Sequence, residues 1–157
     1  MPVVHMVHGY LGAGKTTFSK RLEQELPAVR FSPDEWMVAL YGHDPPAEHF
    51  EDYLNRVFAI THDTWRKVTR AGVDVVLDFG FWSRRLRDET RGMAAELGAT
   101  TRVYALRCAE ETARRRCLAR NLDLGGSLFI APETFDVLRA RFQPLAADEA
   151  HEVVTTE

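Results

Sequence analysis

The stretch that decides the fold is Gly9-Tyr10-Leu11-Gly12-Ala13-Gly14-Lys15-Thr16, which fits the pattern G-x-x-x-x-G-K-[ST]. The preceding residues 3–8 form an apolar run of the kind that makes a buried parallel strand. The following residues 17–26 carry apolar side chains at helical spacing. A strand, a glycine-rich turn and a helix therefore follow one another here, and this context indicates a phosphate-binding loop.

A loop of this kind binds the phosphates of a nucleoside triphosphate through its backbone. Glycines allow consecutive N–H groups to turn toward an anion, and the helix that follows presents its positive dipole end to the same phosphates. We expect Lys15 to reach the β- and γ-phosphates and the Thr16 hydroxyl to bind Mg²⁺. The expected nucleotide-binding residues are Gly9, Gly12, Ala13, Gly14, Lys15, Thr16 and Thr17.

The composition favours one globular domain over residues 1–157. Hydrophobic residues make up 45% and charged residues 27%, which is ordinary for a globular protein. No apolar run approaches the roughly 20 residues needed to cross a bilayer, and the first residues do not resemble a signal peptide. We therefore expect a cytoplasmic protein without membrane segments. Cys108 and Cys117 have neither metal-ligand spacing nor a disulfide framework, and nothing indicates the oligomeric state.

The charge is unevenly distributed along the chain. The net charge is −3, yet residues 84–120 contain ten arginines against five carboxylates. A nucleic-acid-binding module is usually basic overall, so this local excess favours a surface that handles phosphate over one that binds a duplex. Solvated charge on exposed helices explains part of the excess. A nucleic acid is therefore a less expected partner than a small molecule.

Short strand-like and longer helix-like segments alternate along the chain, which is the pattern of an α/β protein. Besides the first strand, we expect strands over residues 28–32, 73–78, 101–106 and 151–155. Besides the first helix, we expect helices from residue 33, over 47–70, 83–97 and 110–121, and from 132 to about 142. Residues 41–46 and 122–131 are expected to be loops.

Two carboxylates follow the carboxyl ends of expected strands. Asp34 lies in the first turn of a helix that Ser32 can cap, and there it could orient an acceptor hydroxyl and take its proton. The other interpretation of Asp34 is an acid that interacts with the helix dipole. Asp78 ends the next strand, and parallel strands point their carboxyl ends toward the ligand crevice. Asp78 is therefore a candidate either for metal binding through water or for contact with the acceptor.

The residues after Asp78 read Phe79-Gly80-Phe81-Trp82. Three aromatic side chains in a crevice suit an acceptor with a flat or apolar part. The alternative is that at least two of them belong to the core, as is usual for Phe and Trp. The candidate acceptor contacts are Asp34, Asp78, Phe81, Trp82 and Arg84.

Two arginines further along the chain could act on the phosphates. Arg116 and Arg120 are one helical turn apart, so both can project toward a shared anion. A mobile lid, approximately residues 114–131, would close these guanidinium groups over the γ-phosphate and exclude water. Arg114 and Arg115 point elsewhere and are expected to be solvated.

Taken in order, these segments resemble the P-loop kinase superfamily, in particular the branch that contains the polynucleotide 5′-kinase domain and small-molecule and antibiotic phosphotransferases. The resemblance covers nearly the whole chain. The loop is its most specific part, and the other segments are persuasive as a series. These are Phe31-Ser32-Pro33-Asp34-Glu35-Trp36, Val75-Val76-Leu77-Asp78-Phe79-Gly80, Arg116-Cys117-Leu118-Ala119-Arg120-Asn121 and residues 132–139.

The resemblance implies a three-layer α/β P-loop NTPase fold with a five-stranded parallel sheet of order 2-3-1-4-5 and a helical lid. It also implies ATP and Mg²⁺ as cosubstrate and cofactor, Asp34 as the base, and Lys15, Arg116 and Arg120 as further catalytic residues. Thr16 and Asp78 are the implied metal-binding residues. Family members that act on nucleic acid often carry an arginine shortly after the aspartate, whereas this chain has Trp36-Met37-Val38 there.

The leading hypothesis is an ATP-dependent kinase that transfers the γ-phosphoryl group to a hydroxyl of a small molecule such as an antibiotic, a nucleoside or a sugar. One alternative is a polynucleotide 5′-hydroxyl kinase that binds oligonucleotides through Arg84, Arg85 and Arg87. Another is a slow ATPase or nucleotide-binding switch. A switch usually needs a glutamine that orients water, and none lies near Asp78.

Overall fold

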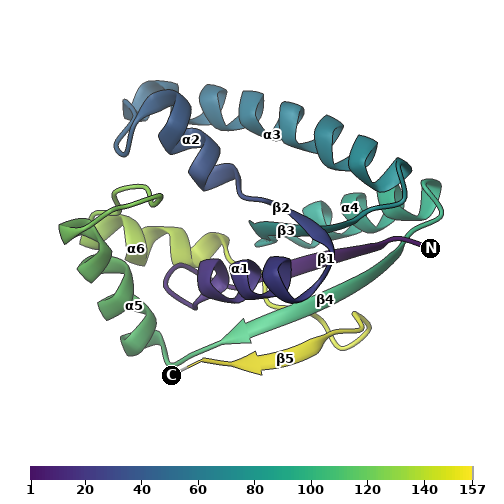
Figure 1. Cartoon of the computed structure of the whole chain (residues 1–157). Coiled ribbons are helices and arrows are strands. Elements are labelled where there is room, and N and C mark those ends of the chain that lie inside the picture. The colour runs from purple at the N-terminus through teal and green to yellow at the C-terminus, as the bar shows by residue number, and fades with distance from the viewer. Residues whose placement is uncertain (157) are drawn as a thin grey trace.

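The computed structural model describes residues 1–156, which form a single parallel sheet with helices on both faces (Figure 1). The five strands lie in the order β2-β3-β1-β4-β5, and each neighbouring pair is parallel. Both the α/β class and the strand order agree with the predictions from sequence. The strands are β1 (Val3–His8), β2 (Ala28–Phe31), β3 (Asp74–Gly80), β4 (Thr100–Arg107) and β5 (Glu152–Thr155).

The helices form the outer two of three layers. Side chains of α1 pack with one face of the sheet, and side chains of α3 and α4 pack with the other face. The helices are α1 (Lys15–Glu25), α2 (Pro33–Tyr41), α3 (Ala47–Arg70), α4 (Arg84–Glu96), α5 (Glu110–Ala119) and α6 (Pro132–Leu138). Two short 3₁₀ turns, η1 (Arg120–Leu122) and η2 (Arg139–Arg141), follow α5 and α6.

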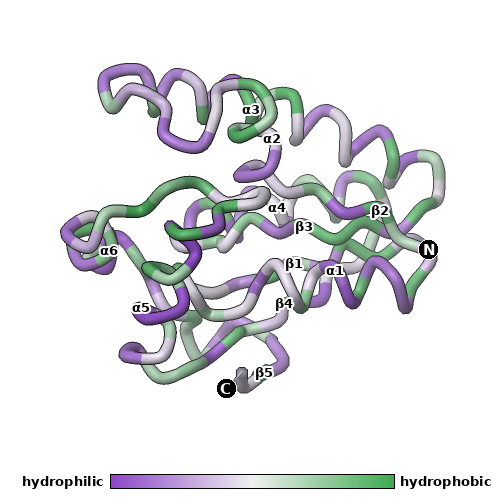
Figure 2. Tube along the Cα trace, turned by 60° about the vertical axis from the view of Figure 1, so that its left-hand side comes forward, coloured by the Kyte–Doolittle hydropathy of each residue, from purple (hydrophilic) through white to green (hydrophobic). Residues whose placement is uncertain are grey.

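The alternation of strand side chains divides the core between the two faces. In β1, Val4 and Met6 pack toward Trp65 of α3, whereas Val7 packs with Phe18 on the α1 side. All five of these side chains are buried. Figure 2 shows hydrophobic residues along the central strands and a largely hydrophilic α5. None of the helices in residues 1–156 is both long and apolar enough to span a membrane.

Local sequence signals explain most of the element boundaries. Ser32 caps α2 by accepting a hydrogen bond from the backbone N–H of Glu35, and Pro33 occupies the first turn, as expected. The helix predicted over residues 110–121 is shorter, since the α-helix ends at Ala119 and continues as a 3₁₀ turn. The helix predicted to reach about residue 142 likewise changes to a 3₁₀ turn after Leu138.

Candidate active site

The glycine-rich loop joins the carboxyl end of β1 to the first turn of α1. Gly12 and Gly14 have φ angles of 76° and 95°, a region that glycine adopts without strain. Gly12 also lies against α5, because a Cβ atom added there would be 2.0 Å from the carbonyl oxygen of Ala113. Within the described part of the chain no side chain caps α1, so its first backbone N–H groups remain available to an anion.

Lys15 folds back across this loop. Its Nζ donates a hydrogen bond to the carbonyl oxygen of Tyr10 at 2.9 Å. Burial lowers the pKa of Lys15, and the carboxylates of Asp78 and Asp34 oppose that shift. The ammonium group therefore lies in the electrostatic field of both predicted active-site aspartates, where a phosphate chain bound by the loop would meet it.

Asp78 is buried beside the first turns of α1. Its Oδ2 accepts a hydrogen bond from the Ser19 hydroxyl at 3.0 Å and lies 3.5 Å from Nη1 of Arg30. Ser19 Oγ is also 3.1 Å from the carbonyl oxygen of Thr16, so one hydroxyl links the loop to the carboxylate. Burial raises the pKa of Asp78, and Lys15 is the strongest of the opposing influences.

Thr16 and Asp78 fit a magnesium ion that is shared with a nucleotide. Mg²⁺ keeps several waters and is usually held by one or two protein oxygens together with substrate phosphates. In residues 1–156 no three His, Cys, Asp or Glu side chains are grouped as metal ligands, so these residues offer no separate protein cage. Ser19 links the backbone carbonyl of Thr16 to the Asp78 carboxylate, so the residue that carries the expected hydroxyl ligand and the carboxylate lie at the same end of α1, as the shared mode of binding requires.

A pocket of about 140 Å³ opens beside Thr16, and we call it the Asp34 pocket. It brings three of the predicted residues together: Thr16 from α1, Asp34 from α2 and Arg120 from η1. Asp34 lines this hollow and is an exposed residue. The surrounding protein atoms raise its pKa by desolvation, and Lys15 opposes the shift. Its other lining residues are Leu11, Lys20, Ser32, Glu35, Gly126, Ser127, Leu128 and Ile130.

Residues 123–131 form a loop that covers part of the Asp34 pocket, and we call it the lid loop. Asn121 donates from Nδ2 to the carbonyl oxygen of Ile130 at 2.7 Å and accepts from the Ile130 N–H at 3.1 Å. His43 Nδ1 lies 2.8 Å from the carbonyl oxygen of Ser127, and the backbone oxygen of His43 accepts from Phe129 N–H at 2.8 Å. The lid loop is therefore tied both to the end of α5 and to the segment between α2 and α3.

The two predicted lid arginines do not share one anion site in this structure. Arg116 donates from Nη1 to the Thr156 hydroxyl at 3.2 Å, and Thr156 in turn donates to the carbonyl oxygen of Ala13 at 2.7 Å. Arg120 instead lines the Asp34 pocket. The one-turn spacing itself holds, because the backbone N–H of Arg120 donates to the carbonyl oxygen of Arg116, but the two side chains have different surroundings.

The structure places the aromatic residues after Asp78 in the core or against the phosphate-binding loop, and none of them lines the Asp34 pocket. Phe81 is fully buried in the core and stacks with Phe79, with ring centroids 5.3 Å apart. Its φ angle of 54°, unusual for a residue other than glycine, turns the chain at the end of β3. Trp82 supports the phosphate-binding loop instead, because its Nε1 donates to the carbonyl oxygen of Gly9 at 3.0 Å.

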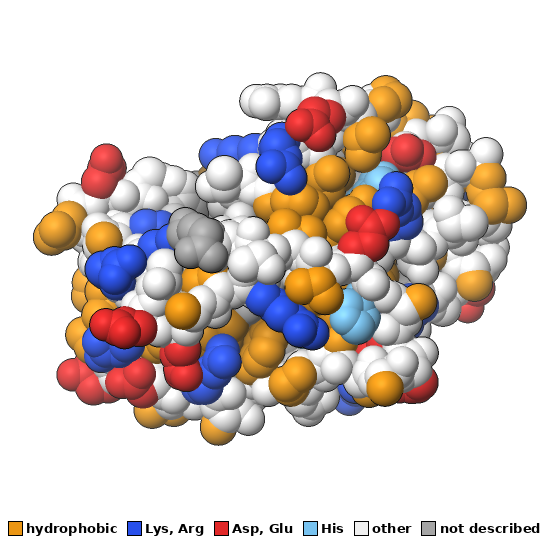
Figure 3. All heavy atoms as spheres, turned by 90° about the horizontal axis from the view of Figure 1, so that it is seen from below, with side chains coloured by type: hydrophobic (Ala, Val, Ile, Leu, Met, Phe, Trp, Pro, Cys, Tyr) orange, Lys and Arg blue, Asp and Glu red, His pale blue; other side chains and the backbone are white. Residues whose placement is uncertain are grey.

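Arg84, the other predicted acceptor contact, does not line the Asp34 pocket either. Its guanidinium group pairs with Asp148 at 2.8 Å, with Asp88 at 3.2 Å and with Glu149 at 3.4 Å. Arg91 pairs with the same cluster of acids. Much of the arginine excess in this region is therefore neutralised by nearby carboxylates. The face shown in Figure 3 likewise has basic and acidic side chains interspersed.

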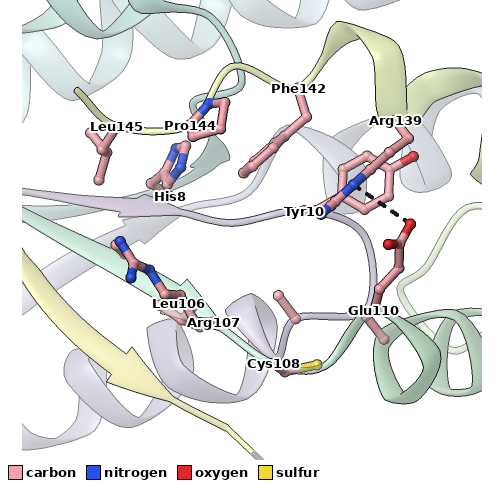
Figure 4. A pocket seen from close by; sticks show the side chains of 13 residues that line it. His8, Tyr10, Leu106, Arg107, Cys108, Glu110, Arg139, Phe142, Pro144 and Leu145 are labelled. Atoms are coloured by element: carbon pink, nitrogen blue, oxygen red, sulfur yellow. Dashed lines mark ion pairs between the residues drawn. The ribbon is translucent and has the colours of Figure 1, made fainter.

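A larger pocket of about 290 Å³ is separate from this chemistry (Figure 4). It contains His8, Tyr10 and Phe142, and Arg139 lies over the Tyr10 ring at 4.6 Å. Glu110 at its rim is 3.7 Å from Arg139. Burial lowers the pKa of His8 to about 4, so this imidazole is neutral at physiological pH. Of the predicted site residues only Ala13 lines this pocket, so the Asp34 pocket is the candidate active site.

The structure adds residues that the sequence reasoning did not single out. Ser19, Arg30 and Thr156 all contact predicted site residues or the loop itself. The spacing of Ser19 three residues after Thr16 offered a signal, because such residues lie on the same face of a helix. Arg30 and Thr156 gave no comparable local signal, since their contacts depend on which strands are neighbours.

The fold and the loop together define a P-loop NTPase domain. A family described as an AAA domain matches residues 4–145. The chain therefore belongs to this family, and its resemblance to P-loop kinases is confirmed at the level of the fold. No curated protein matches the sequence.

Solved structures share the fold at low sequence identity. A candidate kinase from Chloroflexus aurantiacus is 18% identical with a TM-score of 0.75, and the match covers 98% of this chain and 88% of that one. A chain of the Pnkp1/Rnl/Hen1 RNA repair complex is 18% identical with a TM-score of 0.73, covering 89% and 43%. A gluconokinase from Sinorhizobium meliloti is 15% identical with a TM-score of 0.55, covering 98% and 81%. At such identities these matches support the architecture of a P-loop kinase.

Proposed function

We propose that this protein is an ATP-dependent kinase that transfers the γ-phosphoryl group of ATP to a hydroxyl group of a small molecule. The observation that carries the proposal is the Asp34 pocket, in which a carboxylate, the loop threonine Thr16 and the guanidinium of Arg120 line one hollow. A P-loop by itself indicates only that a protein binds a nucleoside triphosphate, and it does not indicate an acceptor. A carboxylate facing the same space supplies a place for the nucleophile.

In the proposed reaction the acceptor oxygen forms a bond to the γ-phosphorus while the bond to the β–γ bridging oxygen breaks, and ADP leaves. Asp34 orients the acceptor hydroxyl and takes its proton. Lys15 and Arg120 hold the phosphate charge, and the lid loop limits the entry of water that would compete with the acceptor. A bound Mg²⁺, held by Thr16 and by Asp78 through water, would neutralise charge on the β- and γ-phosphates.

Substitution of Asp34 tests the proposal directly. We expect Asp34→Asn to lower phosphorylation of the acceptor by about 100-fold or more, because the general base is lost, while the Kd for ATP stays within about threefold. Asp44→Asn, in the exposed segment after α2, is the matched control and should keep full turnover. Full turnover by Asp34→Asn would remove Asp34 from the mechanism. Lys15→Ala should weaken both ATP binding and turnover, and wild-type values in that variant would contradict the nucleotide site.

An assay of ATP-dependent phosphorylation would identify the acceptor. The panel of candidate acceptors consists of aminoglycosides, nucleosides, sugars and 5′-hydroxyl oligonucleotides. The small volume of the Asp34 pocket and the paired arginines of α4 favour a small acceptor. The oligonucleotide arm tests the alternative suggested by the RNA repair complex that shares the fold. Activity with 5′-hydroxyl oligonucleotides alone, falling steeply with salt, would replace the small-molecule proposal. Slow ATP hydrolysis with no acceptor in the panel would favour the switch hypothesis.

A further inference from the structure

Arg30 is a buried cation on the edge strand β2. It pairs in register with Val76 of β3, and Asp78 follows two residues later. Residues two apart on a strand share a face, so Arg30 and Asp78 lie on the same side of the sheet. That side is covered by α1, because Val76 packs there with Phe18 and Leu22. The Arg30 side chain is consequently only 8% exposed, although it comes from an edge strand.

The guanidinium group of Arg30 meets three carboxylates from three different elements. Nη2 donates to both carboxylate oxygens of Glu35, in α2, at 2.7 Å each. Nη1 lies 3.5 Å from Oδ2 of Asp78, in β3. Nε lies 3.4 Å from Oε2 of Glu23, in α1. One cation thus joins β3, which carries Asp78, to α2, which carries Asp34 in its first turn, and to α1, which follows the phosphate-binding loop.

Stability alone gives a weak account of this arrangement. A buried ion pair adds little net stability, because desolvation offsets most of the attraction between the charges. Water also solvates Glu23 and Glu35 in part, since their side chains are 41% and 33% exposed. Geometry gives a stronger account, because the planar guanidinium group holds Nε, Nη1 and Nη2 in one fixed arrangement and so fixes the directions of the three carboxylates that they meet.

We infer that Arg30 is a positioning residue that holds Asp78 and the first turn of α2 in a fixed relation, and so aligns the donor side of the reaction with its acceptor side. Glu35 follows Asp34 directly, and its own N–H is bonded to the Ser32 cap. Arg30 does not line the Asp34 pocket and acts only through its partners. The inference rests on the proposed function, because this alignment matters only if Asp34 and Asp78 serve phosphoryl transfer.

Three full-length variants separate positioning from simple stabilisation. Arg30→Met removes the charge, and Arg30→Lys keeps the charge but has one nitrogen in place of the three that meet carboxylates. Arg21→Met is the control, since it removes an exposed arginine of α1 that pairs with Glu25 at 3.8 Å. Titration calorimetry without acceptor gives the affinity for ATP in Mg²⁺ relative to that in EDTA. Steady-state assays with the acceptor found by the panel give kcat and KM, and thermal melting reports folding.

We define the Mg²⁺-dependent gain as the Kd for ATP in EDTA divided by the Kd in Mg²⁺. For Arg30→Met we expect this ratio to fall about 10-fold and kcat to fall about 10- to 100-fold, as for residues that orient metal ligands. The KM for the acceptor should change far less than kcat. Arg30→Lys should recover most of the Mg²⁺-dependent gain, because a cation remains beside Asp78, but its kcat should stay about 10-fold low. Arg21→Met should match the wild type within about twofold, because exposed ion pairs contribute little.

If Arg30→Met melts at a lower temperature but keeps both the Mg²⁺-dependent gain and kcat within about twofold of the wild type, the positioning role is overturned. Should that variant fail to fold, Glu35→Gln carries the test. It should lower kcat about 10-fold and leave the Mg²⁺-dependent gain unchanged, and an unchanged kcat overturns the inference. A wild-type chain that binds no ATP would overturn the proposed function itself, whereas ATP binding with unaltered Arg30→Met values overturns only the role of Arg30.

Discussion

At the scale of single residues, Gly12 shows how closely the phosphate-binding loop is fitted to its neighbours. Its φ angle of 76° already favours glycine, and the carbonyl oxygen of Ala113 occupies the place where a side chain would begin. Gly42 has a similar φ of 85° but has no atom within 4 Å of an added Cβ. Both glycines therefore have a positive φ angle, but only Gly12 is crowded by a neighbouring element.

We expect Gly12→Ala to weaken ATP binding by about 10-fold or more and to destabilise the fold by about 1–3 kcal/mol, because the methyl group must push α5 away from the loop. Gly42→Ala should lower the free energy of unfolding through backbone strain alone, and its Kd for ATP should be unchanged. Calorimetric ATP titration and thermal melting of both variants provide the comparison. Equal ATP affinities in the two variants would contradict the importance of the contact between the loop and α5.

At the scale of elements, the lid loop is attached by a small number of hydrogen bonds. Asn121 bonds both the N–H and the carbonyl oxygen of Ile130, so its side chain acts as a short strand partner at the base of the loop. The loop carries little buried apolar surface, and Leu122 beside it is 92% exposed. Segments held mainly by hydrogen bonds open at low free energy, which suits a lid.

Asn121→Ala should therefore loosen the lid loop. We expect faster amide hydrogen exchange at Ile130 and a several-fold higher ratio of ATP hydrolysis to acceptor phosphorylation, because water enters more freely. The control is Asn55→Ala, at an exposed position of α3. The role of Asn121 is contradicted if the Asn121→Ala variant has the same amide exchange rate at Ile130 and the same ratio of ATP hydrolysis to acceptor phosphorylation as the wild type.

At the scale of the whole molecule, a buried ion pair joins the last part of the chain to α4. Arg87 and Glu149 are each 1% exposed in their side chains and lie 2.7 Å apart. Arg87 also donates to the carbonyl oxygens of Phe81 and Gln143. This cluster connects the end of β3 to the segment that returns to the edge strand β5. Hydrogen bonds from Arg87 contribute most to lowering the pKa of Glu149 to about 2.

Because the pKa of Glu149 is depressed from 4.5 to about 2, its contribution to stability is complete above pH 4.5 and is lost as the pH falls toward 2. We expect Glu149→Gln to cost about 3–5 kcal/mol at pH 7, since it leaves Arg87 buried without its carboxylate. Urea unfolding gives the free energy of unfolding of both proteins. The difference between them should decrease as the pH falls from 4.5 toward 2. Asp148→Asn breaks the ion pair with Arg84, and the Asp148 side chain is 66% exposed. This variant should therefore lower the free energy of unfolding by only about 1 kcal/mol or less. A Glu149→Gln deficit that is the same at pH 7 and at pH 3 would contradict this account.

The sequence by itself determined the parts of the site that depend on neighbouring residues. The spacing around Gly9 to Thr16 specified a strand, a turn and a helix. The Ser32-Pro33-Asp34 segment specified a capped helix start beside a strand end, and the structure has both. The alternation of apolar segments specified the parallel sheet. Such signals are local, because backbone conformation, capping and periodicity depend on residues a few positions apart.

Tertiary structure alone decided which polar groups meet. Ser19 and Asp78 are 59 residues apart in the chain, and Thr156 and Ala13 are 143 apart. Phe81 became a core residue and Arg84 an ion-paired one for the same reason, since their surroundings come from distant segments. The physical reason is that a side chain's residue type fixes what it can bind, whereas strand order and helix packing fix what lies within reach. Of the three carboxylates around Arg30, Glu35 and Glu23 are only 5 and 7 residues away in the chain, whereas Asp78, 48 residues away, is brought to it by the order of the strands.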